Sequence, residues 1–150
     1  MEKHFHIDPD QSVGALVGRL GKVMQRALTE RFRAQGIDLN VDQCIVLMHL
    51  WEEDGQNQAR LGETAGRNKT TVTRAIDSLE RKSLVLRVAD KEDRRNNLIY
   101  LTHAGRDMMQ QVLPNMHMIQ EMATQGIPPQ QMETCKLVLR LMFKNLKNFI

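Results

Sequence analysis

The chain has 150 residues, 41% hydrophobic and 26% charged, which suits a single globular domain with an apolar core and excludes disordered and collagen-like chains. Its formal net charge of +3 is too small to identify a partner, but residues 60–95 hold ten basic and six acidic side chains. No apolar run has the length of a signal peptide or a membrane span, and Cys44 and Cys135 lack the spacing of a zinc motif or a disulfide framework. We therefore expect a soluble protein of the reducing cytoplasm.

The first predicted element is a long amphipathic helix that begins at Val13 and ends near Gly36. Ser12 can cap its start, and Gly36 can end it in a left-handed conformation. At a rise of about 1.5 Å per residue, such a helix is roughly 36 Å long, which exceeds what one compact domain of this size needs. We therefore expect its apolar face to contact a partner; that face consists of Val13, Leu16, Val17, Leu20, Val23, Met24, Ala27, Leu28 and Phe32.

Three shorter helices are predicted next, over residues 42–53, 58–65 and 69–82. Gly66 separates the last two, and Asn68 is a good cap for the third. Two helices joined by a turn that contains glycine are typical of a helix-turn-helix. The first of the three is expected to have one apolar face of Cys44, Ile45, Met48 and Trp51, flanked by Leu47 and Leu50.

Two β-rich runs, 84–88 and 98–101, surround a polar segment and predict a hairpin. The next helix should extend from 102 to about 124, with Pro114 kinking or interrupting it because proline lacks a backbone donor. The final helix, about 129–148, has an apolar side of Met132, Cys135, Val138, Leu139, Met142, Leu146 and Phe149. The pattern predicts a mainly α protein with a small β-hairpin, in which long terminal helices flank a helix-turn-helix unit.

The helix at 69–82 has the residue types of a helix that reads DNA. Its apolar face uses Val72, Ile76 and Leu79, which leaves polar side chains on or near the exposed side: Thr70, Thr71, Thr73 and Arg74. An α-helix fits the major groove, where arginine pairs with guanine and threonine contacts phosphate or the thymine methyl. Backbone N–H groups at the helix start favour phosphate as well. The helix alone is equally compatible with a solvated helix that only packs.

The hairpin tip at residues 90–97 favours the DNA-binding interpretation. Most charged turns have no such role, but a hairpin that directly follows a recognition-type helix lies beside it in space. Its tip can then reach the adjacent minor groove, which attracts arginine where it is narrow. Asp93 is expected to hold an arginine in position through charge-assisted hydrogen bonds.

The segment 61–105 resembles the winged helix-turn-helix of MarR-family transcriptional regulators. The resemblance rests on the helix KTTVTRAIDSLERKSLV, the tip DKEDRRNNLIYLT and the following HAG, and the flanking helices extend it over most of the chain. It implies one domain over 1–150, with dimerisation helices at about 10–36 and 104–150 and a winged lobe at about 41–102. The chain departs from the family at Ser83, where glycine is usual, and at Gly62, where alanine is commoner.

The resemblance implies a homodimer that binds a pseudo-palindromic double-stranded DNA operator and represses transcription until a small molecule, often a phenolic or other aromatic acid, releases it. A MarR-like interaction or thiol-sensing protein without strong operator binding is the alternative, whereas RNA binding is disfavoured because aromatic residues are only 4% of the chain. The implied DNA-binding residues are Lys69, Thr70, Thr71, Thr73, Arg74, Arg94 and Arg95, with Asp93 supporting the wing.

The sequence gives weaker signals for other sites. Met108 and Met109 are candidates for an effector pocket, although methionine is more often simply part of a core. Neither cysteine has an adjacent base that would activate it. His4 and His6 precede Asp8, but a chain terminus rarely forms a closed metal site. Because no nucleophile motif, phosphate-binding glycine loop or HExxH string occurs, we expect no catalytic residues, cofactor or metal.

Overall fold

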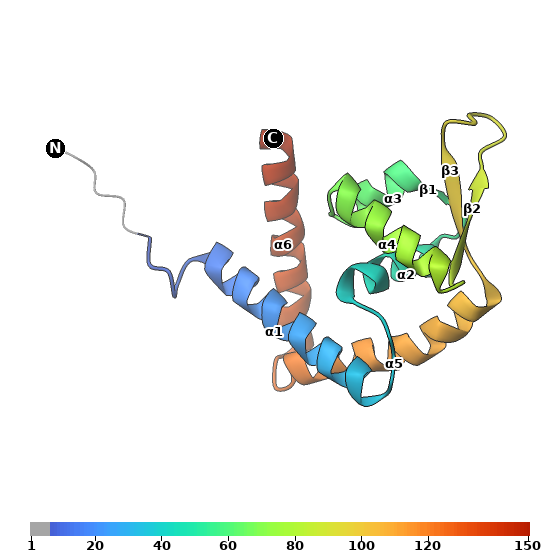
Figure 1. Cartoon of the computed structure of the whole chain (residues 1–150). Coiled ribbons are helices and arrows are strands. Elements are labelled where there is room, and N and C mark those ends of the chain that lie inside the picture. Colours follow the sequence, from blue (N-terminus) through green and yellow to red (C-terminus); the bar gives the residue numbers. More distant parts are fainter. Residues whose placement is uncertain (1–6) are drawn as a thin grey trace.

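The computed structural model describes residues 7–150, and these form six helices and one small antiparallel sheet. A lobe containing α2, α3, α4 and the sheet lies on one side, α1 and α6 lie on the other, and α5 extends from one to the other (Figure 1). This arrangement confirms the predicted mainly α fold with a hairpin wing. The elements are α1 (Val13–Ala34), α2 (Val41–Glu52), β1 (Gln56–Asn57), α3 (Gln58–Thr64), α4 (Lys69–Arg81), β2 (Val85–Ala89), β3 (Asn97–Leu101), α5 (His103–Thr124) and α6 (Pro129–Phe149).

Polar side chains fix the starts of the helices. Ser12 Oγ accepts from Ala15 N at 3.3 Å at the start of α1, and Asn68 Oδ1 accepts from Thr71 N at 2.8 Å at the start of α4, as predicted. The start of α2 lies one residue earlier than predicted. Asn40 caps it in a reciprocal arrangement in which Asn40 Oδ1 accepts from Gln43 N and Gln43 Oε1 accepts from Asn40 N.

The core lies between α2, α4, α5 and the sheet. Leu47 and Leu50 have no exposed surface, whereas Met48 and Trp51 are only partly buried against that core. The predicted face of α2 is therefore right at Cys44, which is buried, and wrong at Met48 and Trp51. The helix α2 packs against α4, α5 and β3 at once. A helix enclosed from several directions buries a wide arc, and its periodicity then does not identify one face.

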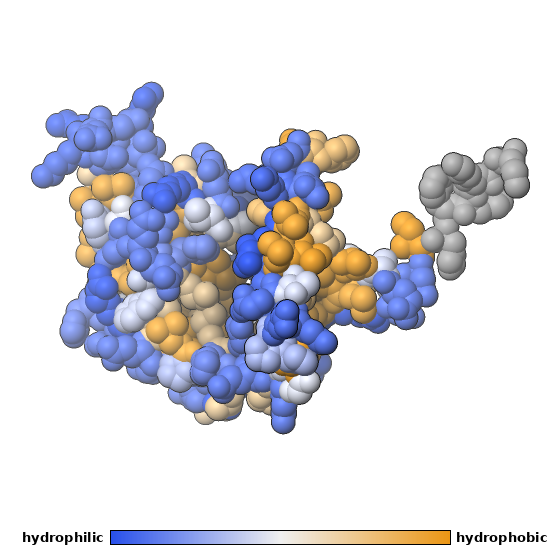
Figure 2. Space-filling view, turned by 180° about the vertical axis from the view of Figure 1, so that it is seen from behind, coloured by the Kyte–Doolittle hydropathy of each residue, from blue (hydrophilic) through white to orange (hydrophobic). Residues whose placement is uncertain are grey.

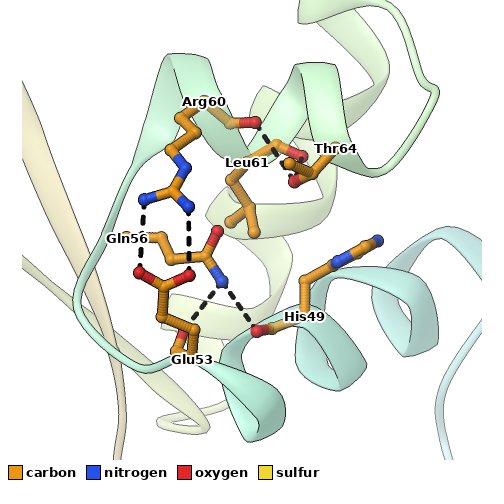
Figure 3. Close-up of polar contacts among 6 residues, drawn as sticks. All are labelled: His49, Glu53, Gln56, Arg60, Leu61 and Thr64. Atoms are coloured by element: carbon orange, nitrogen blue, oxygen red, sulfur yellow. Dashed lines mark hydrogen bonds and ion pairs between the residues drawn. The ribbon is translucent and has the colours of Figure 1, made fainter.

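The strand β1 was not predicted, and it makes the sheet three-stranded in the order β1-β3-β2. Its Gln56 is buried and pairs with Ile99 of β3. The Gln56 amide donates to His49 O and Glu53 O, both at 2.7 Å, which satisfies carbonyls at the end of α2 (Figure 3). Arg60 of α3 binds both carboxylate oxygens of Glu53 at 3.2 and 3.1 Å, so α3 is attached to the end of α2.

Pro114 was predicted to kink or interrupt the helix, and α5 continues through it without interruption. Pro114 and Gln110 are exposed, so the Gln110 carbonyl that loses its donor can bind water. On the opposite side, the buried Asn115 amide donates to Gln111 O at 2.9 Å and to Gln35 Oε1 at 2.8 Å, and its oxygen accepts from Arg31 Nε at 2.9 Å. These contacts hold α5 against α1 just beyond the proline.

The terminal helices leave extensive apolar surface exposed. No residue of α6 is buried, and Figure 2 shows hydrophobic side chains gathered over α6 and the start of α1, whereas the projecting loop between β2 and β3 is hydrophilic. Within residues 7–150, no helix is long and apolar enough to cross a membrane. An exposed stripe of this size in a water-exposed helix marks an interaction surface. Its largest members are Val13, Leu16, Val17, Leu20 and Val23 of α1 and Leu137, Val138, Leu139, Leu141, Phe143, Leu146 and Phe149 of α6.

Ser83 has a left-handed backbone, with φ of 58°, at the turn between α4 and β2. Ser83→Gly is therefore expected to stabilise the fold by about 1 kcal/mol, because glycine adopts this conformation without a Cβ penalty. Chemical denaturation followed by circular dichroism measures this gain. Ser83→Ala is the control, since it removes the hydroxyl but keeps the Cβ, and an equal gain from alanine would show that backbone strain is not the cause.

Candidate nucleic-acid interface

The helix α4 divides into a buried face and a polar face, as predicted. Val72, Ala75, Ile76 and Leu79 are buried. Lys69, Thr70 and Arg74 are exposed, and Thr71 and Thr73 are half-buried. The polar side chains are concentrated in the first half of the helix, where free backbone N–H groups and the positive end of the helix dipole also lie.

Asp93 organises the wing, defined as β2, β3 and the loop between them. Its carboxylate accepts from Arg95 N and Arg95 Nε, both at 3.1 Å, and from Asn96 Nδ2 at 3.2 Å. The side-chain and backbone hydrogen bonds from Arg95 hold the pKa of Asp93 below its ordinary value. The predicted pairing of Asp93 with a wing arginine is thus present, and Arg94 and Arg95 both remain exposed at the tip.

A cleft of about 470 Å³ separates α3 and the start of α4 from the wing. Its lining includes Arg67, Lys69 and Thr73 on one side and Arg95 and Asn97 on the other. Predicted DNA-binding side chains from the helix α4 and from the wing therefore line the same cleft. The lining contains three basic side chains, Arg67, Lys69 and Arg95, and one acidic side chain, Glu63, so its excess of positive charge suits an anionic ligand.

The structure separates the ten basic side chains of residues 60–95 into two groups. One group forms internal ion pairs: Arg60 with Glu53, Arg67 with Asp42, Lys82 with Asp38, Arg87 with Asp77 and Glu80, and Arg95 with Asp93. Cations paired in this way attract an external anion less strongly. The other group has no ion pair to any residue of 7–150 and is exposed: Lys69, Arg74, Arg81, Lys91 and Arg94.

Arg87 is a positioning residue that the sequence reasoning missed. Its side chain is only 18% exposed, and Nη2 and Nη1 lie 2.6 Å from Asp77 Oδ1 and Glu80 Oε2 on α4. Burial opposes the charge, but the hydrogen bonds that Arg87 donates to these two carboxylates raise the pKa of Arg87 overall. The contact attaches the first strand of the wing to α4. The sequence pattern that could have indicated this role is a pair of acidic residues one helical turn apart, followed by an arginine in the next strand.

A mainly apolar cavity of about 360 Å³ lies between α1, α2 and α5. Met24, Leu28, Met48 and Met116 are among its lining residues, with His117 at its polar side. The two methionines predicted for a pocket lie elsewhere. Met109 has no exposed surface, Met108 packs partly against the core, and neither lines this cavity. Met109 is instead part of the hydrophobic core.

Cys44 is buried, and desolvation raises the pKa of its thiol to about 12, whereas Cys135 is exposed. At pH 8 only roughly one Cys44 thiol in ten thousand is therefore ionised. In a Cys135→Ser protein we expect Cys44 to react slowly with a thiol reagent at pH 8 until denaturant is added, as measured by absorbance. Fast reaction of the native protein would contradict this.

Because the pKa of Cys44 in the folded protein exceeds its pKa in the unfolded chain, the stability of the fold is expected to fall as the pH rises from about 9 to 12.

Metal binding gains no support from the part of the chain that the structure describes. Residues 7–150 contain no group of three or more histidine, cysteine, aspartate or glutamate side chains placed to hold a metal ion. His4 and His6 lie outside the described residues.

Comparisons with known proteins point to one family. A family model described as the MarR family matches residues 39–96. The transcriptional repressor MprA of Escherichia coli K12 is 29% identical over 106 residues, which cover 68% of this chain and less than two thirds, 60%, of MprA. A MarR-family regulator structure from Silicibacter pomeroyi is 29% identical, with a TM-score of 0.80 over 93% of this chain and 92% of that one. The structure of Bordetella bronchiseptica BpsR, described as regulated in its DNA binding by 6-hydroxynicotinic acid, is 22% identical with a TM-score of 0.82, over 92% and 97% of the two chains.

Proposed function

We propose that this chain is a member of the MarR family of transcriptional regulators, a homodimeric repressor that binds operator DNA and is released by a small molecule. The observation that carries the proposal is the cleft that α4 and the wing line together, beside cations that form no ion pair with any residue of 7–150. Unpaired cations on a surface that also holds groove-reading side chains suit double-stranded DNA.

In the proposed complex, α4 enters the major groove. Arg74 reads a base edge, Lys69 and the backbone N–H groups of the first turn bind phosphate, and Thr70, Thr71 and Thr73 contact bases or phosphates. The wing tip, residues 90–97, lies at the minor groove with Arg94 and Arg95. Asp93 supports the tip through its contacts with Arg95.

The proposed dimer forms through the exposed apolar faces of α1 and α6. A second copy of this chain would bury both faces, and an isologous pair presents two copies of α4 related by a twofold axis. Two such helices on one face of the duplex read half-sites about one helical turn, roughly 34 to 36 Å, apart. We therefore expect a pseudo-palindromic operator.

The proposed effector is a small aromatic or phenolic acid that binds in the cavity between α1, α2 and α5. The volume of about 360 Å³ suits a small molecule, and its apolar lining with a few polar groups is typical of ligand sites. The regulation of BpsR by 6-hydroxynicotinic acid supports this ligand class. A thermal shift with aromatic acids that disappears in Leu113→Trp, which fills the cavity, tests the location.

The decisive experiment measures affinity for DNA selected from a random duplex pool, by fluorescence anisotropy across salt concentration. Log affinity is expected to fall steeply with log salt, in proportion to the phosphates neutralised. Arg74→Ala should weaken preference at one base position by about 1 to 3 kcal/mol, whereas Arg95→Ala should lower affinity for all sequences and flatten the salt dependence.

Glu92→Gln is a useful control in the same experiment. It removes one negative charge from the wing and so raises the net charge of the wing by one. It should raise affinity slightly for every sequence. If the protein binds selected DNA no more tightly than unrelated duplex, the alternative of a MarR-like interaction protein without strong operator binding is favoured instead.

A further inference from the structure

A chain of polar contacts leads from the wing to the polar face of α4 through Gln58, the first residue of α3. Arg87 Nε donates to Gln58 Oε1 at 3.2 Å, and Gln58 Nε2 donates to Thr73 Oγ1 at 3.2 Å. Arg87, Gln58 and Thr73 are all partly shielded from solvent. Two carboxylates of α4 already hold Arg87 in place. The series of hydrogen bonds therefore connects the fixed Arg87 guanidinium to the Thr73 hydroxyl, which lies on the surface that faces the cleft.

The guanidinium determines which way the Gln58 amide points. A guanidinium has only N–H donors, so the neighbouring amide group must present its oxygen. An amide turned by 180° would place its NH₂ group against Arg87, with donors facing donors. The NH₂ group of Gln58 must therefore face Thr73, whose hydroxyl oxygen accepts from it.

The Thr73 hydroxyl keeps its own proton for another acceptor. Four of the other helical threonines donate that proton to the carbonyl four residues earlier, namely Thr29, Thr64, Thr124 and Thr134. Thr73 makes no such bond to any residue between 7 and 150. A hydroxyl that already accepts from an amide is a stronger donor, because hydrogen bonds in a chain polarise one another.

We propose that Gln58 is a positioning residue that presents the Thr73 hydroxyl as a hydrogen-bond donor to double-stranded DNA. The inference rests on the proposed function and specifies the chemistry of one contact. Guanine O6 and N7, adenine N7, thymine O4 and phosphate oxygens are acceptors, whereas the exocyclic amino groups of adenine and cytosine are donors. Thr73 is therefore expected to disfavour the cytosine amino group at the position it faces.

Gln58→Glu tests this by reversing the polarity at Thr73 while keeping an oxygen for Arg87. The second carboxylate oxygen then accepts the Thr73 proton, so the donor is no longer free for DNA. Thr73→Val is expected to lower operator affinity about five- to tenfold in the otherwise wild-type protein, and less than twofold in the Gln58→Glu background. Gln58→Glu and the double variant Gln58→Glu, Thr73→Val both contain the added negative charge, so the effect of that charge on affinity cancels when the two are compared.

Thr73→Ser retains the hydroxyl and is therefore expected to lose less operator affinity than Thr73→Val does in the otherwise wild-type protein. Thermal midpoints verify that each variant is folded. If Thr73 contacts a base, Thr73→Val removes the sequence preference at one position; if Thr73 contacts a phosphate, Thr73→Val lowers affinity equally for all sequences. Either result supports Thr73 as a hydrogen-bond donor.

Equal losses of affinity from Thr73→Val in both backgrounds, or no loss in either, overturn the proposal. A wild-type protein that selects no sequence from the pool overturns the proposed function instead.

Discussion

Phe143→Asp is expected to make the protein monomeric at micromolar concentration and to lower its affinity for a full operator by at least about a hundredfold. Phe143 is 62% exposed on α6, a helix that buries none of its own residues. In the proposed dimer this ring is covered, and a carboxylate there loses hydration without gaining a partner. A monomer also loses the second half-site, which contributes roughly 10²- to 10⁴-fold through effective concentration.

Sedimentation velocity measures the oligomeric state of this variant, and anisotropy compares its affinity for the full operator and for one half-site. Asn145→Asp is the control, because it adds the same charge two residues along the same helix, at a polar position. It should remain dimeric. If Phe143→Asp sediments as the wild-type protein does and binds as tightly, the proposed interface is wrong.

Gly105→Ala is expected to destabilise the fold by about 3 kcal/mol. A Cβ at this position would lie 2.1 Å from the carbonyl oxygen of Leu84, a backbone atom that cannot rotate away. Gly105 N also donates to Thr102 Oγ1 at 3.0 Å, and that hydroxyl donates to Ser83 O at 2.6 Å. Alanine must therefore displace the start of α5 from the turn before the wing, and overpacking of this kind costs about 1 to 3 kcal/mol or more.

Gly62→Ala is the matched control, since the same substitution is expected to stabilise the fold at this position. The added Cβ would meet Val72 Cγ2 at 3.7 Å, an ordinary contact, and alanine in a helix is more favourable than glycine by up to about 1 kcal/mol. Urea denaturation of both variants measures the two changes. A Gly105→Ala protein as stable as wild type would contradict the close approach of α5 to Leu84.

Local signals predicted most of the helices correctly. The spacing of apolar residues and the caps Ser12 and Asn68 located α1 and α4, because both signals depend only on neighbours within about four residues. The strand β1 was missed for the opposite reason. It has two residues, and its pairing of Gln56 with Ile99 joins segments far apart in the chain.

The candidate site could be predicted as a set of residue types but not as a network. The positions of Thr73, Arg74, Asp93 and Arg95 followed from helix periodicity and the resemblance, and the contact of Asp93 with Arg95 is local. The role of Arg87 could not be predicted in this way. Its partners lie on two other helices, and only the fold shows that some of the basic residues neutralise the protein's own carboxylates.

The free-standing α6 has a consequence for regulation by protein abundance. A helix of 21 residues that buries no side chain gains little from its own chain and is marginal in water. Its helical content is then expected to increase with protein concentration, because the proposed dimer would cover its apolar side. At low cellular concentration, unpaired chains would present an unfolded C-terminal segment to proteases, so turnover would remove monomers and spare assembled dimers.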